Sequence, residues 1–168
     1  MAGGMGGLLT QKEFLLGTMH MRQDVSRLVA YPQHHAFTGP VAVLIDGGSA
    51  STSEILTAGL KEAGRSRIFG SHSAGAALPS LFKTLPTGDL FQYAIADFET
   101  PDGLVIEGNG INPDTVVAST REDLSEGRDR VMEAARSWIS QQLANRDDRA
   151  SLAPDQALPS APKDHAAN

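Results

Sequence analysis

A run of aliphatic residues at positions 41–45 is the feature that most limits how this chain can fold. A continuous aliphatic run is typical of a strand that is buried on both faces of a parallel or mixed sheet. The run is followed by a turn of small and polar residues at 46–54, and then by apolar residues at helical spacing up to Gly64. A second short strand at 67–70 would complete a β-α-β crossover, which predicts an α/β fold.

The rest of the chain carries weaker patterns. Residues 10–31 are expected to be helical, because apolar residues recur there at roughly helical spacing. Residues 81–85 and 90–98 are expected to form a hairpin around the turn Pro86-Thr87-Gly88-Asp89. Short strands are expected at 104–106 and 115–118, and an amphipathic helix at 122–145. Residues 147–168 are polar and contain three prolines, so a disordered tail is expected after a domain of residues 1–146.

Composition excludes several classes of function. The 168 residues include no cysteine, which rules out disulfides, thiolate metal sites and a cysteine nucleophile. The net charge is −6 and the basic residues are scattered, which argues against a nucleic-acid partner. No apolar run approaches the roughly 20 residues that cross a bilayer, so no membrane span is expected. Taken as given, the chain is expected to be cytoplasmic.

The turn after the first strand carries three serines, Ser49, Ser51 and Ser53. A serine at the start of a helix is suited to nucleophilic catalysis, because the free backbone N–H groups of the helix can stabilise an oxyanion. The sequence from Ser51 to Glu54 also fits a capping box, in which both side chains only satisfy donors at the helix end. From the spacing alone, both interpretations stay open.

Four short segments of the chain form ordered motifs. They are VLIDGGSASTSEIL at 43–56, GR at 64–65 with SAG at 73–75, TPDG at 100–103 and EGNGINPD at 107–114. The first resembles the nucleophile region of the tail-specific, or C-terminal processing, serine peptidases of family S41, and the others agree with later motifs of that family, in the same order. Four ordered motifs are far more specific than a single serine motif.

The resemblance implies a fold like that of crotonases and Clp proteases, a spiral of β-α-β units, here with an added antiparallel hairpin and a C-terminal helix. It implies that Ser51 is the nucleophile of a peptidase that acts on peptide or protein substrates by acyl transfer. The backbone N–H groups of Thr52 and of Gly3 or Gly4 would form the oxyanion hole. No cofactor is expected, and no metal site is expected because the sequence has no H-x-x-x-H or clustered carboxylate pattern. The resemblance also implies that the chain starts well inside the catalytic domain of the family.

The chain departs from the family at the general base. Many of these peptidases activate the serine with a lysine, but this chain has Ala76 at the corresponding position, and Lys61 is expected to lie on the surface. A serine without a base is a poor nucleophile near neutral pH. A branch that resembles the tricorn-type peptidases uses a histidine supported by a glutamate. In this chain the glutamate would be Glu107, and the histidine of that branch would lie upstream of Met1, outside the sequence. Among the histidines present, His72 is the candidate base, and an ordinary surface loop residue is the alternative interpretation.

The alternative to an active peptidase is a domain that has lost its catalytic activity. The lysine-free segment 73–79 also resembles repeats of the interphotoreceptor retinoid-binding proteins, which implies an inactive domain that is structural or binds an apolar ligand. A cleft lined by Leu78, Pro79, Leu81 and Phe82 would then be expected. An acyl-coenzyme A enzyme of the crotonase type follows only from analogy of fold.

The sequence leaves the oligomeric state and the cellular compartment open. The C-terminal helix could pack on a second copy of the chain, which would give a homo-oligomer. If an N-terminal segment with an export signal is missing from the sequence, the expected compartment becomes the periplasm or the extracellular space.

Overall fold

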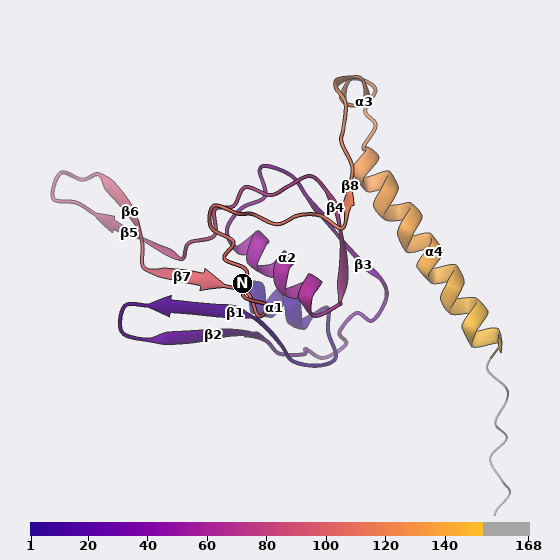
Figure 1. Ribbon diagram of the computed structural model, residues 1–168, viewed down its shortest axis with the longest axis horizontal. Coiled ribbons are helices and arrows are strands. Elements are labelled where there is room, and N and C mark those ends of the chain that lie inside the picture. Colours follow the sequence, from indigo (N-terminus) through magenta and orange to yellow (C-terminus); the bar gives the residue numbers. More distant parts are fainter. Residues whose placement is uncertain (153–168) are drawn as a thin grey trace, which may run out of the picture.

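The computed structural model describes the backbone of residues 1–152 and the side chains of residues 1–123 and 125–146 (Figure 1). Its elements, in chain order, are α1 (Ala2–Gly7), β1 (Phe14–Met21), β2 (Val25–Ala30), β3 (Val41–Ile45), α2 (Thr52–Glu62), β4 (Ser66–Gly70), β5 (Ser80–Thr84), β6 (Leu90–Ala94), β7 (Ala96–Glu99), β8 (Thr115–Val116), α3 (Arg121–Ser125) and α4 (Arg130–Leu152).

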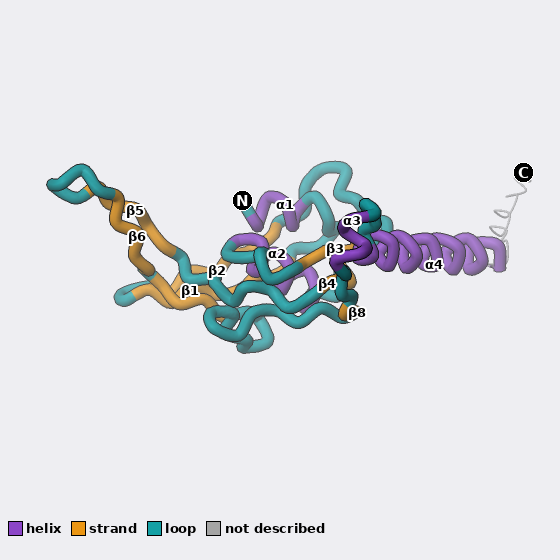
Figure 2. The backbone as a smooth tube through the Cα atoms, turned by 90° about the horizontal axis from the view of Figure 1, so that it is seen from above, coloured by secondary structure: helices purple, strands orange, loops and turns teal. Residues whose placement is uncertain are grey.

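Two small sheets enclose α2. The parallel sheet β3-β4-β8 contains the predicted crossover, with α2 between β3 and β4 in the chain. The antiparallel sheet β2-β1-β7 packs on α2 through β1, while α4 packs on β3 and β4. The β5-β6 hairpin and α4 project from opposite sides of this body (Figures 1 and 2). The expected α/β fold with an added hairpin and a C-terminal helix is therefore confirmed.

The prediction of a helix at residues 10–31 is wrong. This region forms β1 and β2, which pair with each other, and β1 also pairs with the distant β7, from Thr18 opposite Glu99 to Met21 opposite Ala96. Apolar spacing along one segment cannot reveal a partner strand so far along the chain, and that pairing decides the conformation here. The strand expected at 104–106 is reduced to a single bridge between Val105 and Glu99.

The C-terminal helix expected at 122–145 is interrupted. Gly127, with φ +67°, separates α3 from α4, and the Asp129 carboxylate accepts the Met132 N–H in the first turn of α4. The backbone of α4 runs to Leu152 and so includes residues 147–152, which the sequence assigns to the tail; residues 153–168 lie outside the described part. Within residues 1–152, no helix is long and apolar enough to span a bilayer.

The glycine-rich N-terminal segment is the helix α1, and its glycines allow close packing on β2 and the residues that follow. A Cβ atom on Gly6 would lie 2.8 Å from the Ala30 Cβ, and one on Gly7 would lie 2.0 Å from the Tyr31 carbonyl oxygen. Glycine lowers helix propensity, so this composition fits the packing rather than the helix itself. The segment thus brings α1 against both β2 and α2.

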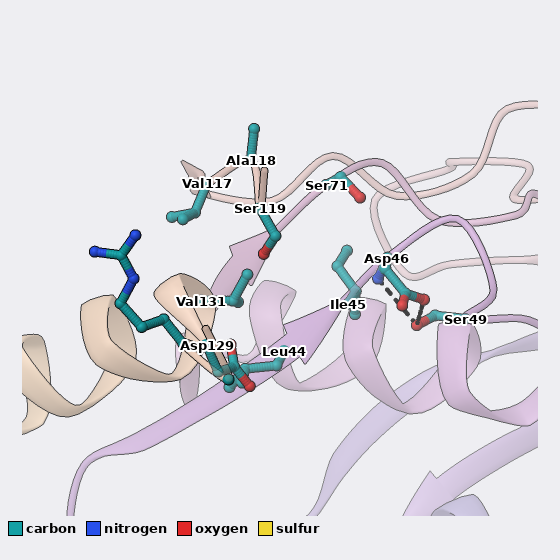
Figure 3. Close-up of a pocket in the computed structure, with 12 residues that line it drawn as sticks. Leu44, Ile45, Asp46, Ser49, Ser71, Val117, Ala118, Ser119, Asp129 and Val131 are labelled. Carbon is teal, nitrogen blue, oxygen red and sulfur yellow. Dashed lines mark hydrogen bonds between the residues drawn. The ribbon is translucent and has the colours of Figure 1, made fainter. Parts of the chain in front are cut away.

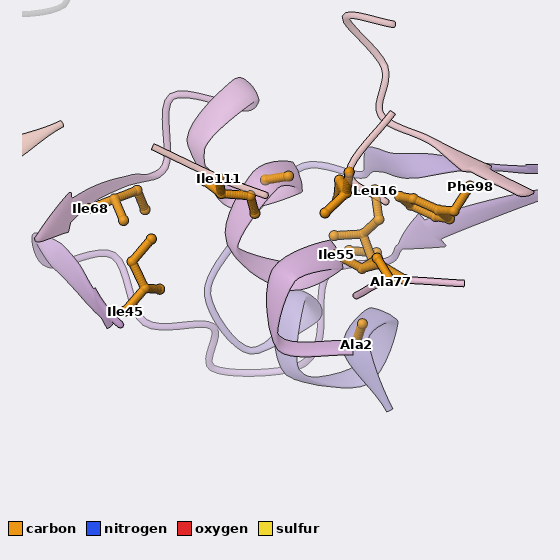
Figure 4. Packing of buried hydrophobic residues seen from close by; sticks show 11 residues of the cluster. Ala2, Leu16, Ile45, Ile55, Ile68, Ala77, Phe98 and Ile111 are labelled. Atoms are coloured by element: carbon orange, nitrogen blue, oxygen red, sulfur yellow. The ribbon is translucent and has the colours of Figure 1, made fainter. Parts of the chain in front are cut away.

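The core lies between α2 and the two sheets (Figure 4). Leu16 of β1 is fully buried and faces α2 at Gly59, where a Cβ atom would lie 2.4 Å from the Leu16 Cδ2 and 3.1 Å from its Cα. Because one of these contacts is to the main chain, a side-chain rotation alone cannot make room. Gly59 therefore sets how closely α2, which begins just after Ser51, packs on β1.

The corner between α3 and α4 is fixed by the buried side chain of Asp123. Its Oδ2 accepts hydrogen bonds from the Thr120 hydroxyl at 2.6 Å and the Thr120 N–H at 2.9 Å, and it pairs with Arg130 Nε at 2.7 Å. Arg128 lies 3.2 Å from the other oxygen. The hydrogen bonds from Thr120, together with Arg130, hold the pKa of Asp123 well below its ordinary value.

We predict that Gly59→Val lowers the free energy of unfolding by about 2 kcal/mol, because the added side chain overpacks the contact with Leu16. Urea denaturation measures the change. The matched control is Ala63→Val at the exposed C-cap of the same helix, which should change stability by less than about 0.5 kcal/mol. Equal stabilities of the two variants would contradict this packing.

We predict that Asp123→Asn lowers the thermal midpoint at neutral pH. Because the folded-state pKa is depressed, the stabilising contribution is complete above the unfolded-state pKa of about 3.9 and is lost as the pH falls through the folded-state pKa. The difference between wild type and variant should therefore shrink below about pH 4. A difference that stays constant down to strongly acidic pH would contradict this, and Glu126→Gln on the exposed side of the corner is the control.

Candidate active site

Ser51 lies at the N-terminus of α2, directly after the turn that follows β3, and its side chain is exposed. Its backbone has φ +60° and ψ −128°. Among the described residues other than glycine, His35 alone shares a positive φ. Such a conformation is costly for a residue with a side chain and persists only where the surroundings impose it. A strained turn from strand to helix is also a geometry that exposes a serine hydroxyl for nucleophilic attack.

The backbone N–H of Ser51 has two acceptors. It donates to the Ala76 carbonyl oxygen at 2.8 Å and to the Glu54 Oε2 at 3.0 Å. Ser51 and Glu54 thus have the predicted capping-box arrangement. The Glu54 N–H also donates to the Ser51 carbonyl oxygen at 2.9 Å. The Glu54 carboxylate therefore ties the main chain of Ser51 to the N-terminus of α2.

Glu54 has the most connected side chain of the site. It is 1% exposed and accepts four hydrogen bonds. Its Oε2 accepts the N–H groups of Ser51 and Ala76, both at 3.0 Å, and its Oε1 accepts the Gly75 N–H at 2.8 Å and the Ser73 hydroxyl at 2.5 Å. Four bonds use the full acceptor capacity of a carboxylate. One side chain thus joins the serine turn to the loop 73–76.

The same loop is tied to the segment that follows Ile106. The Ser73 Oγ accepts the Ile111 N–H at 2.7 Å, and the Gly75 carbonyl oxygen accepts the Gly108 N–H at 2.8 Å. Gly75 has φ +69°, and a Cβ atom there would lie 2.9 Å from the Gly110 nitrogen. Two of the four sequence motifs therefore meet at this loop, directly beside Ser51.

Residue 76 is the position for which the resemblance implies a lysine in many family members, and it adjoins Ser51 in space. The hydrogen bond from the Ser51 N–H to the Ala76 carbonyl oxygen brings the two main chains into contact, and Ala76 itself is exposed. Lys61 is engaged elsewhere: its Nζ lies 2.9 Å from an Asp114 carboxylate oxygen and donates to the Asn112 carbonyl oxygen. Neither residue supplies a base to Ser51.

Glu107 and His72 both lie next to this loop. The Glu107 Oε2 accepts the N–H groups of Ala77 at 2.7 Å and Leu78 at 3.1 Å. The exposed His72 ring places Nδ1 3.0 Å from the Asn112 Oδ1. In the described part of the chain, neither side chain forms a hydrogen bond with Ser51, and no group of three histidine or acidic side chains is placed to hold a metal ion.

The predicted oxyanion donors lie on two adjacent helices. Thr52 is the first residue of α2, and Gly3 and Gly4 lie in the first turn of α1, which packs against α2. The first N–H groups of a helix have no partner within it, so all three positions carry donors that the helices leave free. Gly3 is half-buried and Gly4 is exposed.

A cavity of about 790 Å³ opens beside the serine turn, at the carboxyl ends of β3 and β4 (Figure 3). Its walls include the aliphatic Leu44, Val117 and Val131, and its polar edge includes Asp46, Ser49 and Ser71. The Ser49 hydroxyl donates to the Asp46 Oδ1 at 3.2 Å, which fixes this edge. Ligands of open α/β sheets bind at the carboxyl ends of the strands, so the cavity is well placed for one.

Sequence reasoning singled out Ser51 but missed the contacts of Glu54 with the loop 73–76, because the spacing assigned this residue only to a helix cap. No spacing along the chain relates Glu54 to Ser73 or Gly75, because the contacts depend on the crossover. The predicted apolar cleft also differs from what is seen. Leu78 and Pro79 are half-buried, but Leu81 and Phe82 lie exposed on the β5-β6 hairpin, outside the cavity beside the serine turn.

Known proteins are similar to this chain in sequence and in fold. The chain is 35% identical over 79 residues to a probable CtpA-like serine protease of Staphylococcus haemolyticus, a match that covers 47% of this chain and 16% of that protein. The photosystem II D1 C-terminal processing protease matches with a TM-score of 0.60 and 26% identity, over 69% of this chain and 30% of that one.

A putative peptidase from Parabacteroides merdae shares the fold, with a TM-score of 0.69 and 22% identity over 82% of this chain and 46% of that one. The curated relatives are much longer proteins, since the matched part is about 16% of their length. The sequence model of peptidase family S41 matches residues 5–117, which is more than half of the chain. On these findings the chain belongs to peptidase family S41.

Proposed function

We propose that this chain cleaves peptide bonds in peptide or protein substrates by acyl transfer through Ser51. The observation that carries the proposal is the strained, exposed position of Ser51 at the start of α2, in a chain of a peptidase family. In the first step the Ser51 Oγ attacks the carbonyl carbon and the peptide C–N bond breaks, so that an acyl-enzyme forms and the amine leaves with a proton. Water then attacks the ester and restores the serine.

In this proposal the Thr52 N–H and the N–H of Gly3 or Gly4 bind the oxyanion of the tetrahedral intermediate. Thr52 lies next to the nucleophile at the positive end of the α2 dipole, where a developing negative charge is favoured. The packing of α1 on α2 supports the second donor.

The proposed reaction also needs a general base. His72 is the candidate base and Glu107 its candidate support, because both adjoin the loop that carries Ala76. The absence of a lysine at position 76 favours the second function, an inactive S41 domain that serves as a structural module or binds an apolar ligand. The aliphatic walls of the cavity beside Ser49 would suit such a ligand.

We predict that a fluorophosphonate probe labels the purified chain at Ser51, because the reagent phosphonylates a serine with a competent oxyanion site. Intact-mass and peptide mass spectrometry measure the label. Ser51→Ala should remove it, whereas Ser49→Ala and Ser53→Ala in the same turn should retain it. A folded wild-type chain that takes up no label, or that is labelled equally after Ser51→Ala, would contradict the peptidase and favour the inactive domain.

The assignment of His72 is tested in the same assay. If His72 is the base, His72→Ala slows labelling by about 10²-fold or more, within the range that general base catalysis supplies. Labelling at the wild-type rate would remove His72 from the machinery while leaving Ser51 in it.

We predict that Ala76→Lys raises the labelling rate by about 10²- to 10⁴-fold, because it places an amine beside the Ser51 turn where related peptidases have one. The rate is compared with that of Ala74→Lys, an exposed position in the same loop. Equal rates for the two variants, with both folded, would show that residue 76 does not reach Ser51.

A further inference from the structure

We infer that Glu54 is a positioning residue, which sets the conformation of Ser51 by joining it to the loop 73–76. The inference rests on the proposed function, because it names the group that keeps the proposed nucleophile in its reactive geometry. It goes beyond the capping box, which explains only one of the four hydrogen bonds to this carboxylate.

The division of those bonds between the two oxygens separates positioning from capping. A cap requires one oxygen to accept the N-cap N–H, and Oε2 does this for Ser51. The other three donors, the Ser73 hydroxyl and the N–H groups of Gly75 and Ala76, belong to the loop after β4. A helix cap alone would leave Oε1 to solvent, whereas here it is buried with two protein donors.

Burial makes the carboxylate hard to replace. Glu54 is 1% exposed, so water cannot take over the donors if the side chain is changed. Glutamine has almost the same shape, but its amide NH₂ would have to face either the Ser51 and Ala76 N–H groups or the Ser73 and Gly75 donors. With the NH₂ toward Ser51 and Ala76, two hydrogen bonds are lost and donors face donors. With the NH₂ toward Ser73 and Gly75, the Gly75 N–H loses its acceptor and the Ser73 hydroxyl must turn to accept.

The consequence for Ser51 follows from its backbone. A φ of +60° with ψ −128° is unfavourable for serine, and the Ser51 N–H is held only by the Ala76 carbonyl oxygen and the Glu54 carboxylate. Glu54 also fixes the Ala76 N–H, so it acts on both of these contacts. Loss of the carboxylate therefore frees the serine turn and the loop together.

The test is Glu54→Gln, with Glu62→Gln as the matched control. Glu62 lies on the same helix, is only half-buried, and accepts a single hydrogen bond, from the Asp102 N–H. We expect Glu54→Gln to raise the amide hydrogen-exchange rates of Ser51, Gly75 and Ala76 by about tenfold or more, since each loses or weakens a bond. Exchange in β3 and β4 should stay close to wild type, and Glu62→Gln should leave all three amides protected.

Fluorophosphonate labelling provides the second readout. Glu54→Gln should slow the labelling of Ser51 by about tenfold or more without changing its site, and Glu62→Gln should label at the wild-type rate. If Glu54→Gln does not fold, Ser73→Ala is used instead, because it removes one donor from Oε1 and keeps the carboxylate. This variant should show smaller changes in the same direction at Gly75 and Ser51.

The possible failures are distinguishable. A wild-type chain that takes up no label would refute the proposed peptidase, while the exchange data would still judge the role of Glu54. Exchange and labelling at wild-type rates in folded Glu54→Gln would overturn the positioning role, even in an active chain. A uniform rise in exchange across β3 and β4 as well would also overturn it, because Glu54 would then support only the general stability of the fold.

Discussion

The buried carboxylate of Glu54 is the interaction on which the rest of the candidate site depends. It gathers four donors from two segments that are separate in the sequence, the serine turn and the loop 73–76. Because this side chain is buried, the three donors of the loop depend on it, while the Ser51 N–H is shared between Glu54 and the Ala76 carbonyl oxygen. The strained backbone of Ser51, the place of residue 76 beside it and the contact with the segment 108–111 all follow from this arrangement.

The β3-α2-β4 crossover could be predicted from the sequence, because local hydrophobic patterns specify each of its elements. The aliphatic run of β3, the helix α2 and the strand β4 form a crossover whose partners are close in sequence, and each occurs where the pattern indicates it. The β1-β2 hairpin was not predictable in this way, because β1 owes its conformation partly to pairing with β7. The break between α3 and α4 was readable in principle, since Gly127 and Asp129 are ordinary end and start signals of helices.

For the candidate site, the sequence pointed to individual residues but not to the contacts between them. Ser51 and the position of Ala76 follow from motifs, and the structure brings their main chains into contact. The links from Glu54 to Ser73 and from Glu107 to Ala77 depend on how the crossover folds, which no spacing records. The positive φ of Ser51 is equally invisible in the sequence, because serine rarely adopts it without tertiary support. The chain thus combines an exposed serine of positive φ at the start of α2 with an alanine at position 76.

The most direct test of the central claim is a crystal structure of the chain after reaction with a fluorophosphonate. We expect a covalent bond from the Ser51 Oγ to phosphorus, with a phosphonyl oxygen that accepts the Thr52 N–H within about 3.1 Å. We also expect the adduct to retain the four hydrogen bonds to Glu54. A phosphonyl group on another side chain, or one on Ser51 whose oxygens all point into solvent, would contradict a nucleophilic Ser51 with Thr52 as oxyanion donor.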